Sequence, residues 1–258
     1  MRADVYLTEN GYVPSRRRAQ ELISEGCVRI DGKTVPKASF PVGEGEHLVE
    51  VQDSLAYVSR GGLKLEAALD RFLPNVQGLI ALDIGASTGG FTDCLLSRGA
   101  ARVYAVDAGC GQLAAKLQND PRVISKEHLN ARALSPADID GAQVDLIVMD
   151  VSFISATYIL PQFPALLRES GHAICLIKPQ FEVGRSMLGK GGIVKDPAAH
   201  RFAVERVLRG GLGAGLCPVG LMASPVAGGD GNREFLVHFT PGTPAEGDAM
   251  IDRLIRQL

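Results

Sequence analysis

The fold is decided by one stretch of sequence, Leu82-Asp83-Ile84-Gly85-Ala86-Ser87-Thr88-Gly89-Gly90-Phe91. An apolar strand is predicted at 79–83 and a helix at 91–98, so this stretch forms the turn that joins them. Glycines in such a turn leave room for a ligand to approach the backbone. We therefore predict that the turn holds a nucleotide-like cofactor through Asp83, Gly85, Ser87, Thr88, Gly89, Gly90 and Phe91.

A carboxylate one strand later supports this prediction. The run Tyr104-Ala105-Val106-Asp107 reads as a strand that ends in an acid. A carboxylate at this place accepts hydrogen bonds from ribose hydroxyls, which makes Asp107 a second predicted cofactor contact. The alternative is that the glycines serve packing and that Asp107 only caps a helix. The combination of both features favours a cofactor.

The order of residues in the turn separates two classes of cofactor. Dinucleotide-binding dehydrogenases carry GxGxxG, where a helix N-terminus faces a pyrophosphate. This chain instead reads DxGxxxGG from Asp83. Because Asp83 would repel a pyrophosphate and attract the positively charged methionine end of S-adenosylmethionine, the turn favours S-adenosylmethionine over NAD.

The chain beyond residue 60 alternates apolar strands with helical stretches. This rhythm predicts an α/β fold on a mostly parallel sheet with helices on both faces. Asp196 followed by Pro197 is typical of a helix start. The predicted strands are 79–83, 102–107, 146–150, 173–178, 218–223 and 235–239, and the predicted helices include 91–98 and 197–209.

The chain before residue 60 has the pattern of a small α+β unit. Two short helices precede a hairpin whose turn is Asp31-Gly32, a dipeptide that readily adopts positive φ angles. Val49 and Val51 predict a closing strand, which a linker follows. The predicted domains are residues 1–58 and 59–258.

Three charged residues stand at the ends of predicted strands, namely Asp150, Lys178 and Glu234. Ligands of open α/β sheets bind at the carboxyl ends of the parallel strands, so Asp150 and Lys178 should flank the reacting group. Glu234 joins them if the last strand runs antiparallel. Lys178 follows an apolar run, and a lysine partly withdrawn from water holds its proton less strongly, which makes Lys178 a candidate base. Simple ion pairs between strand ends are the alternative.

Several motifs together make the whole chain similar to a known family. They are SRGGLK at 59–64, DIGASTGGFTD at 83–93, DVSFIS at 150–155, IKPQFEVG at 177–184 and GNREF at 231–235. On these stretches the chain resembles the TlyA family of ribosomal RNA cytidine 2'-O-methyltransferases. Members of that family, some of which are labelled haemolysins, join an S4 RNA-binding domain to an FtsJ-like methyltransferase domain.

The resemblance implies a fold, a reaction and a set of catalytic residues. The fold is a Rossmann-like methyltransferase with a mostly parallel seven-stranded sheet, its last strand antiparallel, behind a small α+β S4 domain. The family's Lys-Asp-Lys-Glu tetrad falls on Lys64, Asp150, Lys178 and Glu234. The family's linker usually carries a tryptophan, where this chain has Tyr57.

The implied reaction needs little beyond alignment and proton removal. S-adenosylmethionine carries an electrophilic methyl group, so the enzyme has to position a ribose 2'-hydroxyl and take its proton. We assign Lys178 as the base, Lys64 as a second positive charge that stabilises the alkoxide, and Asp150 and Glu234 as residues that orient the two amines. We expect no metal, because the histidines are isolated in the sequence.

The predicted partner is ribosomal RNA, contacted by basic side chains. A cluster of such residues binds phosphates without reading base sequence. The alternative for three adjacent arginines is an ordinary solvated helix face. The candidate RNA contacts are Arg2, Arg16, Arg17, Arg18, Lys33 and Lys37 in the first domain and Arg60 in the SRGGLK motif.

Composition places limits on the function. The formal net charge of -2 gives no global attraction to nucleic acid, so RNA binding depends on local patches. The five cysteines are odd in number and form no CxxC pair, which indicates a reducing cytoplasm. The N-terminus is charged and lacks the apolar run of a signal peptide, so secretion is not expected. Two other functions stay open, a non-catalytic RNA-binding protein and a haemolysin-like protein, although no spanning segment supports the latter.

Overall fold

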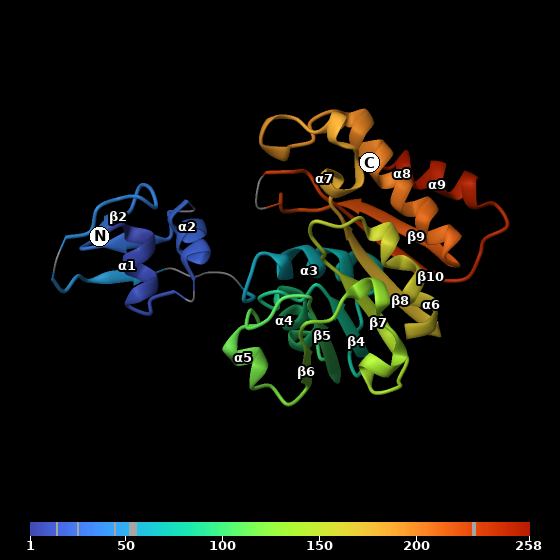
Figure 1. Cartoon of the computed structure of the whole chain (residues 1–258), viewed down its shortest axis with the longest axis horizontal. Helices are drawn as coiled ribbons and strands as arrows, with labels where there is room; N and C mark the ends of the chain where they lie inside the picture. Colours follow the sequence, from blue (N-terminus) through green and yellow to red (C-terminus); the bar gives the residue numbers. More distant parts are fainter. Residues whose placement is uncertain (14, 25, 44, 52–55, 229–230) are drawn as a thin grey trace. The chain divides into compact units, whose positions relative to one another are not determined.

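The chain forms two compact units, residues 1–55 and 56–258 (Figure 1). The computed structural model describes residues 1–13, 15–24, 26–43, 45–51, 56–228 and 231–258. The domain boundary between residues 58 and 59 stays a prediction. Residues 52–55, which belong to the predicted linker, lie outside the described residues.

The first unit packs two helices, α1 (Ala3–Glu9) and α2 (Arg16–Ser24), against a small antiparallel sheet. Asp31 and Gly32 have φ angles of 51° and 74° and join two paired strands, so the predicted hairpin is confirmed. The predicted closing strand is confirmed as well, because β3 pairs with β1. The strands, in the order β2-β1-β3, are β1 (Val28–Ile30), β2 (Lys33–Thr34) and β3 (Val49–Val51).

The second unit is built on a seven-stranded sheet with the order β6-β5-β4-β7-β8-β10-β9. The strands from β6 to β8 run parallel, whereas β10 is antiparallel to both of its neighbours. The prediction of a mostly parallel sheet with an antiparallel last strand is therefore confirmed. The strands are β4 (Ile80–Ile84), β5 (Arg102–Val106), β6 (Val123–Lys126), β7 (Val144–Met149), β8 (Leu167–Ile177), β9 (Leu216–Ala223) and β10 (Phe235–Pro241).

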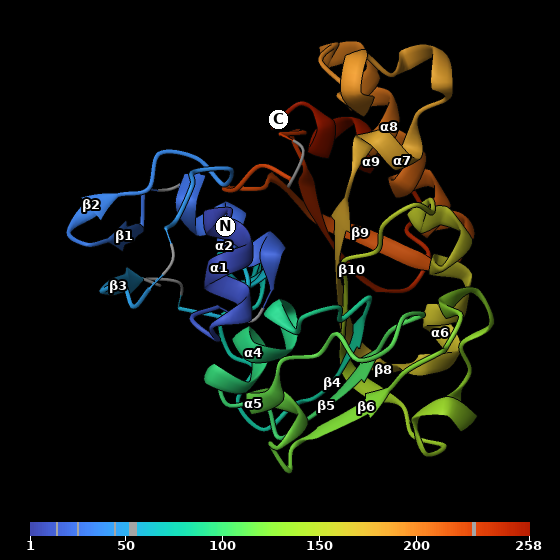
Figure 2. The same cartoon turned by 60° about the vertical axis from the view of Figure 1, so that its left-hand side comes forward.

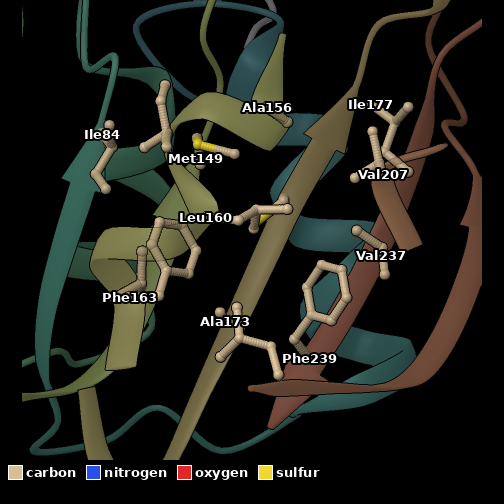
Figure 3. Close-up of a cluster of buried hydrophobic side chains, with 14 of the residues drawn as sticks. Ile84, Met149, Ala156, Leu160, Phe163, Ala173, Ile177, Val207, Val237 and Phe239 are labelled. Carbon is tan, nitrogen blue, oxygen red and sulfur yellow. The ribbon is translucent and has the colours of Figure 1, made fainter. Parts of the chain in front are cut away.

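Helices cover both faces of this sheet, and the alternation along β7 shows why. Leu146 and Val148 pack into one apolar cluster, while Ile147 and Met149 pack into the other. One face carries α3 (Gly61–Phe72), α4 (Gly90–Ser97) and α5 (Ala115–Gln118). The other face, whose cluster is drawn in part in Figure 3, carries α6 (Phe163–Leu166), α8 (Pro197–Gly213) and α9 (Gly247–Ile255).

The predicted start of α8 is confirmed. The side chain of Asp196 accepts a hydrogen bond of 2.9 Å from the Ala198 N–H, and Pro197 is the first helical residue. α8 and α9 lie side by side, as Figure 2 shows. No helix in the described ranges has the length and apolar character needed to span a bilayer.

The remaining helical segments are short and lie in the connections between strands. α7 (Pro179–Glu182) follows β8 directly and lies close to α8. The 3-10 turns are η1 (Ala131–Ala133), η2 (Pro136–Ile139), η3 (Ala156–Tyr158), η4 (Leu160–Gln162), η5 (Arg185–Met187) and η6 (Lys190–Gly192).

Candidate active site

The glycine-rich turn lies between β4 and α4, where the sequence predicts it. A Cβ on Gly85 would lie 2.5 Å from the carbonyl oxygen of Asp150, and one on Gly89 would lie 2.2 Å from Leu117 Cδ1. A Cβ on Gly90 would meet Ser59 Oγ at 2.2 Å. These glycines are thus required by packing against neighbouring segments of the protein. Packing is the alternative that the sequence left open for these glycines, and the approach of a ligand to them stays a prediction.

Other residues of the turn differ in what they offer a ligand. Ser87, at φ 48°, and Thr88 are exposed, so their polar groups are accessible. Phe91 is 3% exposed and belongs to the core cluster under α4. Its aromatic ring therefore faces the protein interior, so the predicted cofactor contact of Phe91, which stays a prediction, is left to its backbone.

Asp83 is fully buried at the carboxyl end of β4. Its Oδ2 accepts a hydrogen bond of 2.7 Å from Thr92 Oγ1, a residue that sequence reasoning left without a role. Within the described part of the chain, Oδ1 has no hydrogen-bond partner. Burial raises the pKa of Asp83 to about 7, and the nearby charges of Asp150 and Asp107 act in the same direction. A cationic amine would satisfy such a carboxylate.

Asp107 stands beside a small pocket at the end of β5. Its Oδ2 accepts from the Ser87 N–H at 2.8 Å and its Oδ1 from the Gly109 N–H at 2.7 Å. Gln112 and Glu127 also line this pocket. Sequence reasoning missed both, because they lie in irregular connections that no strand or helix pattern marks.

The structure brings the four tetrad residues together as two ion pairs. Lys64 Nζ lies 2.5 Å from Glu234 Oε2, and Lys178 Nζ lies 2.6 Å from Asp150 Oδ1. Lys64 comes from α3, and Glu234 precedes β10, whose Phe235 pairs with Ile177 next to Lys178. Because β10 runs antiparallel, its first residues, and Glu234 before them, lie at the edge where the parallel strands end.

The two pairs differ in their surroundings. Burial raises the pKa of Glu234, and the charge of Lys64 opposes this rise. Lys178 donates a hydrogen bond of 2.8 Å to Ser152 Oγ. Lys178 Nζ is close enough to Asp150 Oδ1 for an ion pair, but the two groups are not oriented for a hydrogen bond. Ser152 thus helps to fix the lysine amine, a role that its place in the DVSFIS motif did not disclose.

Two aromatic side chains lie close to this pair in the sequence and contact each other. Phe153 is 91% exposed and has φ 65°, an uncommon value for a residue other than glycine. Its ring centroid lies 5.2 Å from that of Phe181. An aromatic ring held in solvent by a strained backbone indicates a contact surface.

The basic residues of the first unit differ in accessibility. Arg2 and Arg16 both form ion pairs with the buried carboxylate of Asp4, at 2.9 Å and 3.3 Å, although their side chains stay about half exposed. Hydrogen bonding from Arg2 holds the pKa of Asp4 well below its usual range. Arg18 is 6% exposed, so its burial does not support the predicted RNA contact. Exposed candidates are Arg17, Lys33 and Lys37. In the second unit, Arg60 is half-buried.

The histidines are less isolated than the sequence indicates. His172 Nδ1 and His238 Nε2 lie 3.0 Å apart on neighbouring strands, and burial lowers the pKa of His238 to about 4. Among the residues that the structure describes, no three His, Cys, Asp or Glu side chains form a group that could hold a metal ion.

Two family models match the chain. The FtsJ-like methyltransferase model matches residues 57–240, and the S4 domain model matches residues 1–48. Among solved structures, a putative hemolysin from Streptococcus thermophilus is similar over 100% of this chain and 94% of its own, with a TM-score of 0.77 and 38% identity.

Two curated relatives match over most of their length. A Bacillus subtilis protein named putative rRNA methyltransferase YqxC is 42% identical over 100% of this chain and 92% of its own. A Mycobacterium tuberculosis protein named 16S/23S rRNA (cytidine-2'-O)-methyltransferase TlyA is 46% identical over 92% of this chain and 88% of its own. The chain therefore belongs to the TlyA family, in which an S4 domain precedes an FtsJ-like methyltransferase domain.

Proposed function

We propose that this chain transfers a methyl group from S-adenosylmethionine to the ribose 2'-hydroxyl of a cytidine in ribosomal RNA. The observation that carries the proposal is the pairing of Lys178 with Asp150 and of Lys64 with Glu234 at the carboxyl edge of the sheet. The name of the Mycobacterium tuberculosis relative supports the choice of ribosomal RNA and of cytidine.

The residues around the turn fit S-adenosylmethionine. Asp83 Oδ1 is buried and free to accept from the methionine ammonium. Asp107, whose oxygens each keep a second lone pair, suits the ribose hydroxyls beside the pocket that Gln112 and Glu127 line. When bound, the cofactor supplies a methyl group on a positively charged sulfur. Gly85, Ser87, Thr88, Gly89, Gly90 and the Phe91 backbone complete the proposed cofactor site.

The protein's own task is to remove the proton of the 2'-hydroxyl. Lys178 in its neutral form accepts this proton, while Asp150 and Ser152 hold its amine in place. Lys64 provides a fixed positive charge that stabilises the developing alkoxide, and Glu234 holds Lys64. These steps need no group beyond the four tetrad residues and Ser152.

The first unit and the aromatic pair suit an RNA substrate. Arg17, Lys33 and Lys37 are exposed on an S4 domain and can contact phosphates, and the side chains of Arg2 and Arg16 stay about half exposed. Phe153 and Phe181 offer rings on which an unstacked base can lie. Because ribosomal RNA is the substrate, we expect the protein to act in the cytoplasm.

Methyl transfer to ribosomal RNA tests the proposal. The full chain should place a 2'-O-methyl group on a cytidine, and Lys178→Ala should reduce the rate by about two to four orders of magnitude with cofactor affinity retained. Lys126→Ala is a matched control, because Lys126 pairs with Asp140 at 3.4 Å on the outermost strand β6. RNA binding without transfer would favour a non-catalytic RNA-binding protein, and leakage of lipid vesicles would favour a haemolysin.

A further inference from the structure

One buried carboxylate takes no part in the chemistry above. Glu182, the last residue of α7, is 2% exposed. It accepts a hydrogen bond of 2.5 Å from Ser155 Oγ and one of 2.8 Å from the Ala156 N–H. Ala156 belongs to the buried cluster drawn in Figure 3. Glu182 therefore joins α7 to the segment at the start of η3.

Arg206 of α8 completes this arrangement, which we call the Glu182 clamp (Glu182, Ser155, Ala156 and Arg206). Its Nη1 donates a hydrogen bond of 2.6 Å to the backbone oxygen of Glu182, and its Nε lies 4.0 Å from Glu182 Oε2. The Ser155 hydroxyl also contacts Thr157 Oγ1 at 2.7 Å. Both ends of the clamp are thus fixed to helical segments.

The clamp connects the two segments that carry the Lys178–Asp150 pair. The loop 150–155 begins with Asp150 and contains neither helix nor strand. α7 begins directly after Lys178. Between these segments lie three successive contacts, namely the Lys178 amine with Asp150 and Ser152, the Phe153 ring with the Phe181 ring, and the Glu182 clamp.

A stabilising role alone explains a buried carboxylate poorly. Burial raises the pKa of Glu182, which shows that its charged form is disfavoured by the surroundings. Removing a carboxylate from water costs free energy that offsets much of what its hydrogen bonds contribute, so a buried carboxylate is weak evidence for stabilisation. A directional contact is instead what the loop 150–155 requires, because it has no backbone ladder to hold it.

We propose that Glu182 is a positioning residue for methyl transfer, which holds the loop 150–155 against α7 so that Lys178, Asp150 and Ser152 keep their contacts. The inference rests on the proposed function and names a further residue on which it depends. Glu182 touches no reacting atom; it acts through Ser155 and the Ala156 N–H.

Four variants of the full chain test this role. Glu182→Ala removes both acceptors and should lower kcat about 10- to 100-fold, since a displacement of about 1 Å has an effect of that size. The KM for RNA and the Kd for S-adenosylmethionine should change less than about threefold, because none of the four clamp residues is a proposed cofactor or RNA contact. Ser155→Ala, which removes one of the two bonds, should lower kcat by an intermediate factor.

Glu182→Gln should restore kcat to within about threefold of the parent. Its amide oxygen can accept from the Ala156 N–H and its amide nitrogen can donate to Ser155 Oγ, while the Ser155 hydroxyl donates to Thr157. A purely electrostatic role would not give this rescue, because the glutamine amide carries no charge. The double variant Glu182→Ala/Ser155→Ala should turn over no more slowly than Glu182→Ala alone, because both changes break one clamp.

Asp138→Ala is the matched control. Asp138 accepts from the Ser135 N–H at 2.8 Å and from Ser135 Oγ at 2.9 Å, the same two kinds of bond, but in η2, which belongs to the connection between β6 and β7 and carries no residue of the proposed active site. It should lose some thermal stability and keep kcat.

The inference is overturned by a folded Glu182→Ala variant with kcat within about threefold of the parent, by a Glu182→Gln variant as slow as Glu182→Ala, or by loss of cofactor affinity in proportion to kcat. If Glu182→Ala does not fold, parent-like turnover in Ser155→Ala overturns it. A parent protein that transfers no methyl group to RNA defeats the proposed function instead, which keeps the two failures distinct.

Discussion

The Lys64–Glu234 pair allows a quantitative test, in which Lys64→Met removes the charge and keeps most of the length of the side chain. The two side chains are 9% and 2% exposed, and their charged atoms lie 2.5 Å apart. The substitution leaves Glu234 buried without a cation, which costs about 3–5 kcal/mol. At about 2–4 °C per kcal/mol for a domain of this size, the unfolding midpoint should fall by about 6–20 °C.

The deficit should depend on pH in a definite direction. Burial already raises the pKa of Glu234 and Lys64 opposes this rise, so the pKa rises further in the variant. A carboxylate whose folded pKa exceeds its unfolded value destabilises the fold where it is ionised, and this effect disappears as the pH falls through the folded pKa. The midpoints of variant and parent should therefore converge on acidification.

Calorimetry of the full chain measures both effects. The double variant Lys64→Met/Glu234→Gln contains no buried charge at this place and should regain most of the lost stability, while methyl transfer stays low because the positive charge is absent. Lys116→Met is a control, because Lys116 pairs with Asp93 at 2.8 Å but is 57% exposed, and such a pair contributes about 0–1 kcal/mol. A Lys64→Met midpoint equal to that of Lys116→Met, or a double variant no more stable than the single one, would refute the reasoning.

Three further predictions concern the ligands. Affinity for S-adenosylmethionine should fall as the pH drops below about 7, the pKa to which burial raises Asp83, and isothermal titration of Asp83→Asn should show no such dependence. Asp107→Ala should weaken cofactor binding by about 1–3 kcal/mol in the same assay, and an unchanged Kd would remove Asp107 from the site. Arg17→Glu with Lys33→Glu should weaken rRNA binding and flatten its salt dependence with cofactor affinity intact; an unaltered salt slope would mean that RNA binds elsewhere.

The strands that the sequence predicts best are those buried on both faces. The run 146–149 is apolar throughout because its side chains enter both core clusters, and a continuous apolar run is a strong signal. β6 and the helices α3 and α9 are missing from the prediction. β6 lies at the edge of the sheet with partly exposed side chains, so it shows no such run. The apolar residues of α3 do recur at helical spacing, at Leu65, Ala68, Leu69 and Phe72, so this helix was predictable from the sequence.

The sequence could suggest the residues of the candidate site, but it could not predict the contacts between them. Asp150 and Lys178 follow apolar strands, and chain order alone predicts that they meet at one edge. The partner of Lys64 lies 170 residues away, and only the register of β10 against β8 determines that it is Glu234. The exposure of Phe153 depends on a positive φ angle that its residue type does not indicate. Contacts of this kind arise from packing between distant segments.

The burial of the two ion pairs supports the proposal that Lys178, and not Lys64, is the base. A base has to lose its proton before it can accept another, and its partner carboxylate is then left without a cation. Glu234 is 2% exposed, so a neutral Lys64 would leave a charge with almost no access to water. Asp150 is 22% exposed and can be hydrated when Lys178 is neutral.

The neighbours of the two lysines lead to the same assignment. The amine of Lys178 donates a hydrogen bond to Ser152, the residue before Phe153, whose ring is exposed. We therefore expect the Lys178 amine to be within reach of a nucleotide that stacks on Phe153. Glu234 is closed in by the chain, since a Cβ on Gly228 would lie 2.4 Å from its Oε1. These surroundings support the proposal that Lys178 is the base and that Lys64 acts as a fixed positive charge.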